Sequence, residues 1–148
     1  VLDDVLNLMK HLVLSKRVTC TFDKAVDLPP VFAVANPLQQ VFLNLFTNAI
    51  DALEGRKDGV ISLRSYLRNR RVCVDIADNG TGIPEEIQEQ IFDPFFTTKS
   101  VDKGTGLGLA IIHSILKDYE GLIDLKSAPG SGTRFTVSFP PHGGDKNL

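Results

Sequence analysis

Three short polar side chains stand in a row along a segment with helical periodicity. Asn44, Asn48 and Asp51 are separated by four and three residues, which places them on one face of a helix. Asparagine carbonyls are neutral, hard oxygen donors, and Mg²⁺ takes such ligands while nucleotide phosphates and waters complete its shell. An ordinary solvated helix face accounts equally well for any one of these residues, since Asn disfavours helix interiors only mildly. The row is a candidate metal and phosphate site that other motifs must support.

A polar turn rich in glycine follows a strand-like run at Asp78, Asn79, Gly80, Thr81 and Gly82. The order puts the Asp78 carboxylate at the end of the strand, and glycine reaches backbone angles that are closed to other residues. A carboxylate at this place is able to accept a hydrogen bond from an exocyclic amine such as that of adenine. An Asp-Gly-rich strand exit is more often only a turn, so the motif alone is weak evidence.

A second glycine-rich segment, residues 104–109, precedes another helical pattern. The free N–H groups and the dipole of a helix N-terminus form an anion site that suits a phosphate. The segment is not a P-loop, because it lacks the final GK[ST], and Leu109 stands where a dinucleotide fingerprint needs its last glycine. Lys99, just upstream, could add a positive charge to the phosphates, although a loop lysine is most often simply solvated.

The composition indicates one packed domain, since 148 residues with 43% hydrophobic and 23% charged side chains are average for a globular protein. The net charge of −2 provides no basic surface for nucleic acid, so we expect no nucleic-acid partner. No apolar stretch reaches the ~20 residues that cross a bilayer, and no signal peptide is recognisable. Cys20 and Cys73 are expected to be buried free thiols, which favours a cytoplasmic location. His11, His113 and His142 have no nucleophile or metal partner at a recognised spacing and are interpreted as structural.

Helical spacing of apolar residues predicts helices over residues 1–15, 36–54 and 107–119, and a short helix over 84–90. For the second helix, Asn36 is the expected N-cap, with Pro37 at the first position and Gln39 at the third. The expected core stripes are Leu38, Val41, Phe42, Leu45, Ala49, Ile50 and Leu53 in the second helix, and Leu107, Ile111 and Ile115, with Leu109, Ile112 and Leu116, in the third. Gly121 is the expected stop of the third helix.

Strand patterns cover residues 18–22, 60–67, 72–77, 122–126 and 133–139, with a short extended piece at 31–34. Strand pairs follow one another without an intervening helix. This order predicts an α+β fold, a two-layer α/β sandwich in which a mixed, mostly antiparallel sheet carries helices on one face. Residues 91–105 have no steady period and are expected to form a mobile loop, and the tail after Pro140 is expected to be disordered.

Together and in this order, the motifs resemble the catalytic domain of sensor histidine kinases, within the superfamily that includes gyrase, heat-shock chaperone ATPases and mismatch-repair ATPases. The matching segments are an N box at 44–49, a G1 box at 78–82, an F box around 92–96, a G2 box at 104–109 and a last glycine motif at 130–133. Five motifs in register span nearly the whole chain, which makes the resemblance specific. It implies a Bergerat-type ATP-binding fold with ATP and Mg²⁺ as cofactors.

The resemblance implies a role for each matching residue. Asn48, with Asn44, contacts Mg²⁺, Asp78 reads the adenine amine, and Thr133 helps Asp78 hold the base through a water. Lys99 reaches the phosphates from a lid that covers the nucleotide. The implied catalytic residues are Asn44, Asn48 and Lys99, and the implied nucleotide-binding residues are Asn48, Asp51, Asp78, Gly80, Gly82, Ile83, Thr98, Lys99, Gly104, Thr105, Gly106, Leu107, Gly108, Leu109 and Thr133.

One position separates kinases from hydrolases in this superfamily. The ATPases carry a glutamate one helical turn before the metal asparagine, and here that position is Asn44. A neutral amide cannot act as a general base, so the chain is better suited to present the γ-phosphoryl group to another nucleophile than to hydrolyse ATP. An ATP-driven conformational ATPase, a nucleotide-dependent binding module and a serine kinase of the anti-sigma type remain as alternatives.

In the kinase reading, the nucleophile is a histidine on a separate dimeric helical hairpin, and no such motif occurs here. Residues 1–15 are then the end of a helix that links to that dimerisation and phosphoacceptor domain, residues 16–140 the catalytic ATP-binding domain and residues 141–148 a tail. The expected partners are ATP or ADP, the phosphoacceptor domain of the same protein and the receiver domain of a response regulator in two-component signal transduction. The isolated domain is expected to be a monomer.

Overall fold

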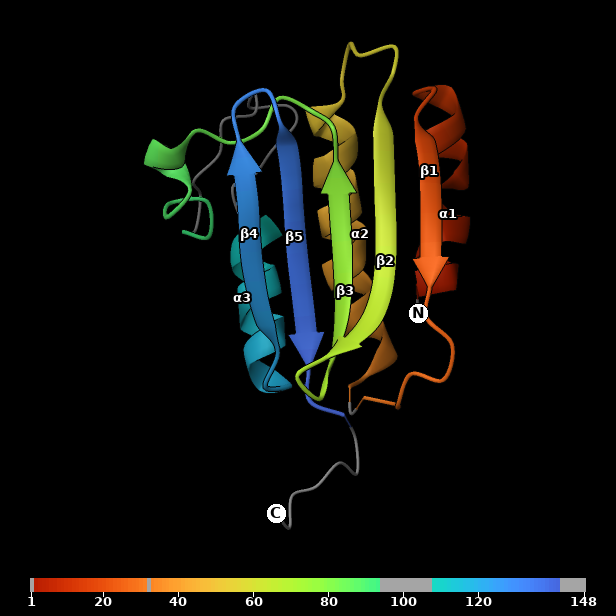
Figure 1. Cartoon of the computed structure of the whole chain (residues 1–148), viewed down its shortest axis with the longest axis vertical. Coiled ribbons are helices and arrows are strands. Elements are labelled where there is room, and N and C mark those ends of the chain that lie inside the picture. The colour runs from red at the N-terminus through yellow and green to blue at the C-terminus, as the bar shows by residue number, and fades with distance from the viewer. Residues whose placement is uncertain (1, 32, 94–107, 142–148) are drawn as a thin grey trace.

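The computed structural model describes residues 2–31, 33–93 and 108–141. Within these ranges a five-stranded sheet has the order β1-β2-β3-β5-β4, and the helices cover one of its faces (Figure 1). The elements in chain order are α1 (Leu2–Ser15), β1 (Thr19–Lys24), α2 (Ala35–Ala52), β2 (Val60–Arg68), β3 (Arg71–Asp78), the 3₁₀ helix η1 (Glu85–Ile87), α3 (Gly108–Asp118), β4 (Leu122–Ala128) and β5 (Gly132–Phe139). The predicted two-layer α+β sandwich is confirmed.

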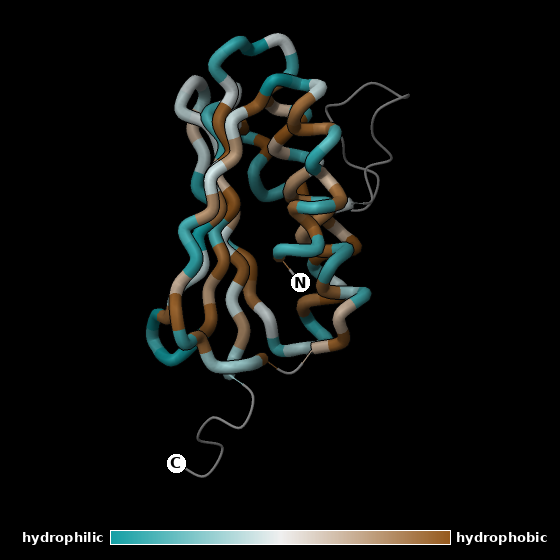
Figure 2. Tube along the Cα trace, turned by 90° about the vertical axis from the view of Figure 1, so that its right-hand side faces the viewer, coloured by the Kyte–Doolittle hydropathy of each residue, from teal (hydrophilic) through white to brown (hydrophobic). Residues whose placement is uncertain are grey.

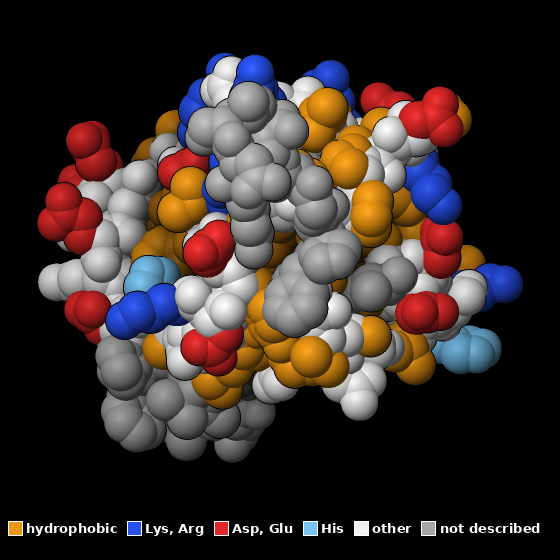
Figure 3. All heavy atoms as spheres, turned by 90° about the horizontal axis from the view of Figure 1, so that it is seen from below, with side chains coloured by type: hydrophobic (Ala, Val, Ile, Leu, Met, Phe, Trp, Pro, Cys, Tyr) orange, Lys and Arg blue, Asp and Glu red, His pale blue; other side chains and the backbone are white. Residues whose placement is uncertain are grey.

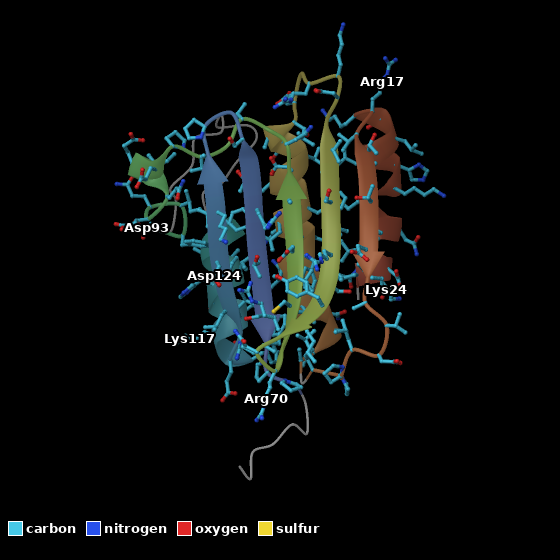
Figure 4. All side chains as sticks on the ribbon, viewed as in Figure 1. Arg17, Lys24, Arg70, Asp93, Lys117 and Asp124 are labelled. Atoms are coloured by element: carbon cyan, nitrogen blue, oxygen red, sulfur yellow. The ribbon has the colours of Figure 1, made fainter. Side chains whose placement is uncertain are left out.

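The sheet is mixed because the two strands joined through α2 pair in parallel. Helix α2 carries the chain from β1 to β2, and these two strands pair in parallel, whereas the β2–β3, β3–β5 and β4–β5 pairs are antiparallel. The β2–β3 turn consists of Asn69 and Arg70, both with positive φ (52° and 62°), as a two-residue hairpin turn requires. Arg70 projects from this turn at the lower end of the molecule (Figure 4).

The core lies between the two layers, where apolar side chains of the sheet meet those of the helices (Figure 2). Every residue of the stripe predicted for α2 is buried, and Phe46 is buried with them. Helix α1 contributes Val5 and Met9, while Ile76 of β3 and Val137 of β5 face them from the sheet layer. Removing this apolar surface from water is the main source of the stability of the fold.

The start of α2 differs from the prediction. The N-cap is Val34, which has extended backbone angles (φ −79°, ψ 135°) and makes no side-chain capping bond, so the assignment of Asn36 as N-cap is wrong. Pro37 is therefore the third helical residue, two positions deeper in the helix than expected. The fold tolerates this because the N–H groups of a first helical turn have no partner inside the helix in any case.

The face and the end of α3 also differ from the prediction. Ile112 and Leu116 are buried, but Ile111, which was expected in the core stripe, is 36% exposed. At the helix end the left-handed residue is Glu120 (φ 56°), whereas Gly121 is needed for space, because a Cβ on Gly121 would lie 3.0 Å from the Leu116 side chain. The short helix predicted over residues 84–90 is reduced to the 3₁₀ turn η1.

The open face of the sheet is polar. Asp75 is buried there, and one of its carboxylate oxygens accepts hydrogen bonds from the hydroxyls of Tyr66 (2.9 Å) and Thr136 (2.8 Å). The Arg64 guanidinium lies 4.8 Å from the centre of the Tyr66 ring, and Arg71 donates to the Ser138 hydroxyl at 3.0 Å. Arg64 and Arg71 of this hairpin thus have structural contacts.

Apolar and charged side chains alternate at the lower end of the sandwich, where the β2–β3 hairpin turns and α2 begins (Figure 3). Val34, Leu67 and Leu122 are each more than half exposed in the segments that meet there. Dispersed apolar side chains of this kind are ordinary on a protein surface. Asp78 and Thr133, two of the predicted functional residues that the structure describes, lie at the opposite, upper end.

Candidate functional site

The upper end of the sheet brings together segments that are far apart in the sequence. Strand β3 ends there at Asp78, β4 ends at Ala128, and β5 begins at Gly132 (Figure 1). Asp78 pairs with Thr133 in the β3–β5 register, so the residues expected to hold adenine are neighbours across two strands. The C-terminal end of α2 and the N-terminal end of α3 cover the same end of the sheet.

The Asp78 carboxyl group is half-buried and oriented by the backbone. Its Oδ1 accepts a hydrogen bond from the Gly80 N–H at 2.8 Å. Desolvation by burial raises the pKa of Asp78 above its ordinary value, and backbone hydrogen bonds from Gly80 and Thr133 and the charge of Arg56 oppose that rise. A desolvated acceptor held in one orientation is suited to a ligand N–H.

Three glycines of the site permit close approaches of main chain to main chain. A Cβ on Gly80 would lie 2.5 Å from the Ala52 carbonyl oxygen at the end of α2. A Cβ on Gly82 (φ 76°) would collide with the Ala128 carbonyl oxygen, and one on Gly132 (φ 82°) would collide with that of Asp78. The turn after β3 is therefore wedged between α2 and the β4–β5 hairpin, and no residue with a side chain fits at these places.

Asn79 ties the same turn to the start of β2. Its Oδ1 accepts from the Val60 N–H at 2.7 Å, and its Nδ2 donates to the Asp58 carbonyl at 2.9 Å. In the sequence, Asn79 is recognisable only as part of the G1 box, with no predicted role of its own. Its position directly after the strand, where Asn commonly bonds to nearby backbone, was the available signal.

The predicted metal ligands lie along α2. Asn44 and Asn48 are half-buried and one helical turn apart, and Asp51 follows on the same face, also half-buried. Two neutral oxygen donors fit Mg²⁺ that is shared with nucleotide phosphates better than they fit a metal held by protein alone. Residues 2–31, 33–93 and 108–141 contain no cluster of three or more His, Cys, Asp or Glu side chains that could hold a metal ion.

Part of the predicted nucleotide-binding set lies outside the described residues. Gly108 and Leu109 are the first two residues of α3, and Ile83 packs against the edge of the core. The predicted residues outside the described ranges are Thr98, Lys99, Gly104, Thr105, Gly106 and Leu107.

Two residues that sequence reasoning missed hold Ile83 from both sides. The Ile83 N–H donates to Ser127 Oγ at 2.7 Å, and its carbonyl accepts from Gln88 Nε2 at 2.9 Å. Ser127 Oγ also contacts the Gly132 carbonyl and Thr133 Oγ1, each at 2.9 Å. Ser127 pairs with Thr133 in the β4–β5 register, but it lies one residue beyond the strand predicted over residues 122–126.

The F box begins with an aromatic contact. Phe92 lies with its ring centre 6.3 Å from that of His113 on α3 and 6.4 Å from that of Phe135 on β5, the latter edge to face. His113 is itself exposed, so the ring contact with Phe92 lies on the surface of α3 and not in the core. Asp93, the next residue, lies below η1 at the side of the molecule next to β4 (Figure 4).

The helices of the described part of the chain are all too short or too polar to cross a membrane.

Residues 33–143 match the sequence model of the family described as "Histidine kinase-, DNA gyrase B-, and HSP90-like ATPase". The chain is 39% identical to the sensor kinase CckA of Brucella abortus (strain 2308) over 95% of its own length, and it spans only 16% of the length of that relative.

Solved structures agree with the sequence comparison. The nucleotide-free catalytic domain of the histidine kinase ThkA is 33% identical and superposes with a TM-score of 0.82, covering 94% of this chain and 89% of that domain. ThkA in complex with the response regulator protein TrrA is 29% identical, with a TM-score of 0.77 over 95% of this chain and 39% of that one.

Proposed function

The chain belongs to the histidine kinase-, DNA gyrase B- and HSP90-like ATPase family, as a catalytic domain of the sensor histidine kinase type, and we propose that it transfers the γ-phosphoryl group of ATP to a histidine on a separate helical hairpin. The observation that carries this proposal is the pairing of Asp78 with Thr133 at one end of the sheet, beside the row of Asn44 and Asn48 on α2. The first pair suits a base and the second suits the metal-bound phosphates.

The adenine end of the site rests on hydrogen-bond complementarity. The Asp78 carboxylate accepts from the exocyclic amine, and the Thr133 side chain supports it. Ile83 supplies an apolar contact from the turn that follows Gly82, and its own backbone groups are already bonded to Ser127 and Gln88. The base is thereby recognised by groups whose orientation is set before it arrives.

The phosphate end rests on Asn48, Asn44 and the N-terminus of α3. The amide oxygens of Asn48 and Asn44 would hold Mg²⁺, which neutralises charge on the phosphate oxygens when bound. The backbone N–H groups at the start of α3, around Gly108, favour negative charge at the same end of the molecule. From the family resemblance, we propose Lys99 and the glycines of the G2 box as further phosphate-binding residues.

Asn44 decides between transfer and hydrolysis in this proposal. An amide at this position can orient the metal-bound phosphates but accepts no proton from water. The domain therefore accelerates the reaction by positioning the γ-phosphoryl group and neutralising its charge. The nucleophile then has to be the imidazole of a phosphoacceptor domain in the same protein. We also propose a response regulator receiver domain as the next phosphoryl acceptor, because ThkA, a structural relative, forms a complex with the response regulator TrrA. We further propose a cytoplasmic location, where ATP is available.

The test is to incubate the domain with Mg²⁺ and γ-labelled ATP, with and without a histidine-bearing hairpin from a CckA-type kinase. We expect label on the hairpin that is stable to alkali and lost in acid, as for phosphohistidine. Replacing the hairpin histidine by alanine is the matched control and should abolish labelling. ATP binding without any transfer to matched hairpins would contradict the kinase proposal, and steady phosphate release by the domain alone would favour an ATPase instead.

A further inference from the structure

The Ser127 side chain has three polar contacts that together determine where its proton points. Its Oγ lies 2.7 Å from the Ile83 amide nitrogen, 2.9 Å from the Gly132 carbonyl oxygen and 2.9 Å from Thr133 Oγ1. A serine hydroxyl has one proton to donate and two lone pairs with which to accept. The three contacts therefore use its complete hydrogen-bonding capacity.

Two of these contacts have a fixed direction. The Ile83 N–H can only donate, and it occupies one lone pair of Ser127. The Gly132 carbonyl can only accept, and it takes the single Ser127 proton. The lone pair that remains on Ser127 requires a donor, so the Thr133 hydroxyl must give its proton to Ser127.

The hydrogen bond from the Ile83 N–H to Ser127 is itself supported by Gln88. Its Nε2 donates to the Ile83 carbonyl at 2.9 Å and to the Ser127 carbonyl at 3.0 Å. Both backbone groups of Ile83 are thus hydrogen-bonded, and its N–H remains directed at Ser127 Oγ. Rotation of the Ser127 hydroxyl to another arrangement would leave the Ile83 or Gly132 group without its partner, which costs free energy in a partly buried site.

The consequence falls on Thr133, which is only 7% exposed and pairs with Asp78. With its proton committed to Ser127, the Thr133 hydroxyl offers only lone pairs to a ligand. The upper end of β3 and β5 then presents two acceptors, the Asp78 carboxylate and the Thr133 hydroxyl. We propose that Ser127 is a specificity-determining residue that fixes Thr133 as an acceptor and so favours purine bases with an amino group at position 6 over those with an oxo group.

This inference rests on the proposed binding of a purine nucleotide at Asp78. A 6-amino group donates and matches two acceptors, whereas a 6-oxo group accepts and leaves them unmatched. Without the Ser127 hydroxyl, Thr133 is free to rotate and donate to an oxo group. Ser127 then acts through Thr133 as a positioning residue and touches no nucleotide atom itself.

The experiment compares the dissociation constants of ATP and inosine triphosphate, which differ at position 6 and at the neighbouring ring nitrogen. We expect Ser127→Ala to reduce the preference for ATP by about tenfold, the size of one mismatched hydrogen bond. Ser127→Thr keeps a hydroxyl and should retain the wild-type ratio, and Ser131→Ala, an exposed serine of the same hairpin, is the matched control. In a Thr133→Val background, Ser127→Ala should leave the ratio unchanged, because no hydroxyl remains to be oriented.

A purely structural role for Ser127 would weaken both nucleotides equally and leave their ratio unchanged, which would overturn the inference. If Ser127→Ala does not fold, Ser127→Cys preserves the volume with a poor hydrogen-bonding group, and the same loss of preference is required of it. Failure of the wild-type protein to bind ATP would refute the nucleotide site itself. The two failures are therefore distinguishable in one set of titrations.

Discussion

Oδ1 of Asp78 lies 2.8 Å from the Gly80 backbone nitrogen and accepts its hydrogen bond. This bond and others favour the ionised carboxylate, yet desolvation outweighs them and raises the pKa of Asp78. A group whose pKa is higher in the folded state binds its proton more tightly there, so its ionisation lowers stability as pH rises from the ordinary aspartate pKa through the raised one. The free site thus carries a charge that opposes folding at neutral pH and that a ligand N–H would stabilise.

The first prediction concerns stability. Relative to the wild type, Asp78→Asn should gain stability as pH rises from about 3.9, the ordinary aspartate pKa, through the raised value, because only the wild type ionises there. Denaturant unfolding of both nucleotide-free proteins over a pH series measures this difference. A difference that stays constant across the series would show that Asp78 is not desolvated.

The second prediction concerns affinity for the base. Asp78→Asn should weaken ADP binding by about tenfold to a hundredfold, the range for losing a hydrogen bond to a charged acceptor. Titration calorimetry at neutral pH measures the change. Asp124→Asn makes the same substitution on the open face of β4 (Figure 4) and should leave ADP affinity unaltered. Equal affinity in both variants would remove Asp78 from the site.

The third prediction separates backbone strain from lack of space. Gly130 and Gly132 both have positive φ, but a Cβ on Gly130 meets nothing within 4 Å while one on Gly132 would collide with the Asp78 carbonyl. Gly130→Ala should cost about 1–2 kcal/mol of unfolding free energy from the left-handed conformation alone. Gly132→Ala should cost about 1–3 kcal/mol more and should also reduce ADP affinity, because Asp78 has to move. Equal losses in chemical denaturation would refute the close approach.

The fourth prediction concerns the metal end. Asn48→Ala should remove most of the Mg²⁺-dependent part of ATP affinity while the affinity measured with excess EDTA changes little. Thr47→Ala, at an exposed neighbouring position on α2, is the control for helix stability and should behave as the wild type. An equal loss with and without Mg²⁺ would mean that Asn48 acts through packing.

The layer arrangement was predictable because it rests on local patterns. The stripe of α2 from Leu38 to Leu53 follows the helical period, and the β2–β3 and β4–β5 hairpins connect neighbouring strands through short turns. The wrong predictions concern features that depend on contacts between residues far apart in the sequence. Val34 starts α2 without a polar cap, and Ile111 faces solvent because packing against the sheet rotates α3 toward Ile112 and Leu116.

The site was predictable as a set of motifs and much less as a geometry. Gly82 has the positive φ that sequence reasoning assigns to glycine, but Gly80 is needed because the Ala52 carbonyl lies beside it. That contact joins α2 to the turn after β3 and leaves no trace in the local sequence. The hydroxyl chain from Ser127 to Thr133 was missed for a similar reason, since it depends on which face of β4 looks toward the helices.

The glycine contacts at the upper end of the sheet also determine which substitutions the site can survive during evolution. Gly80, Gly82 and Gly132 each rest on a carbonyl oxygen, an atom that every amino acid provides. Ala52 and Ala128, which supply two of these carbonyls, can therefore change their side chains without altering the surface against which the turn is packed. Asp78 supplies the third, and its side chain is restricted by the hydrogen bond from Gly80 and by its proposed contact with the base. Mutational robustness is thus asymmetric, since the packing leaves the side chains of these neighbours unrestricted while three positions without a Cβ preserve the shape of the turn.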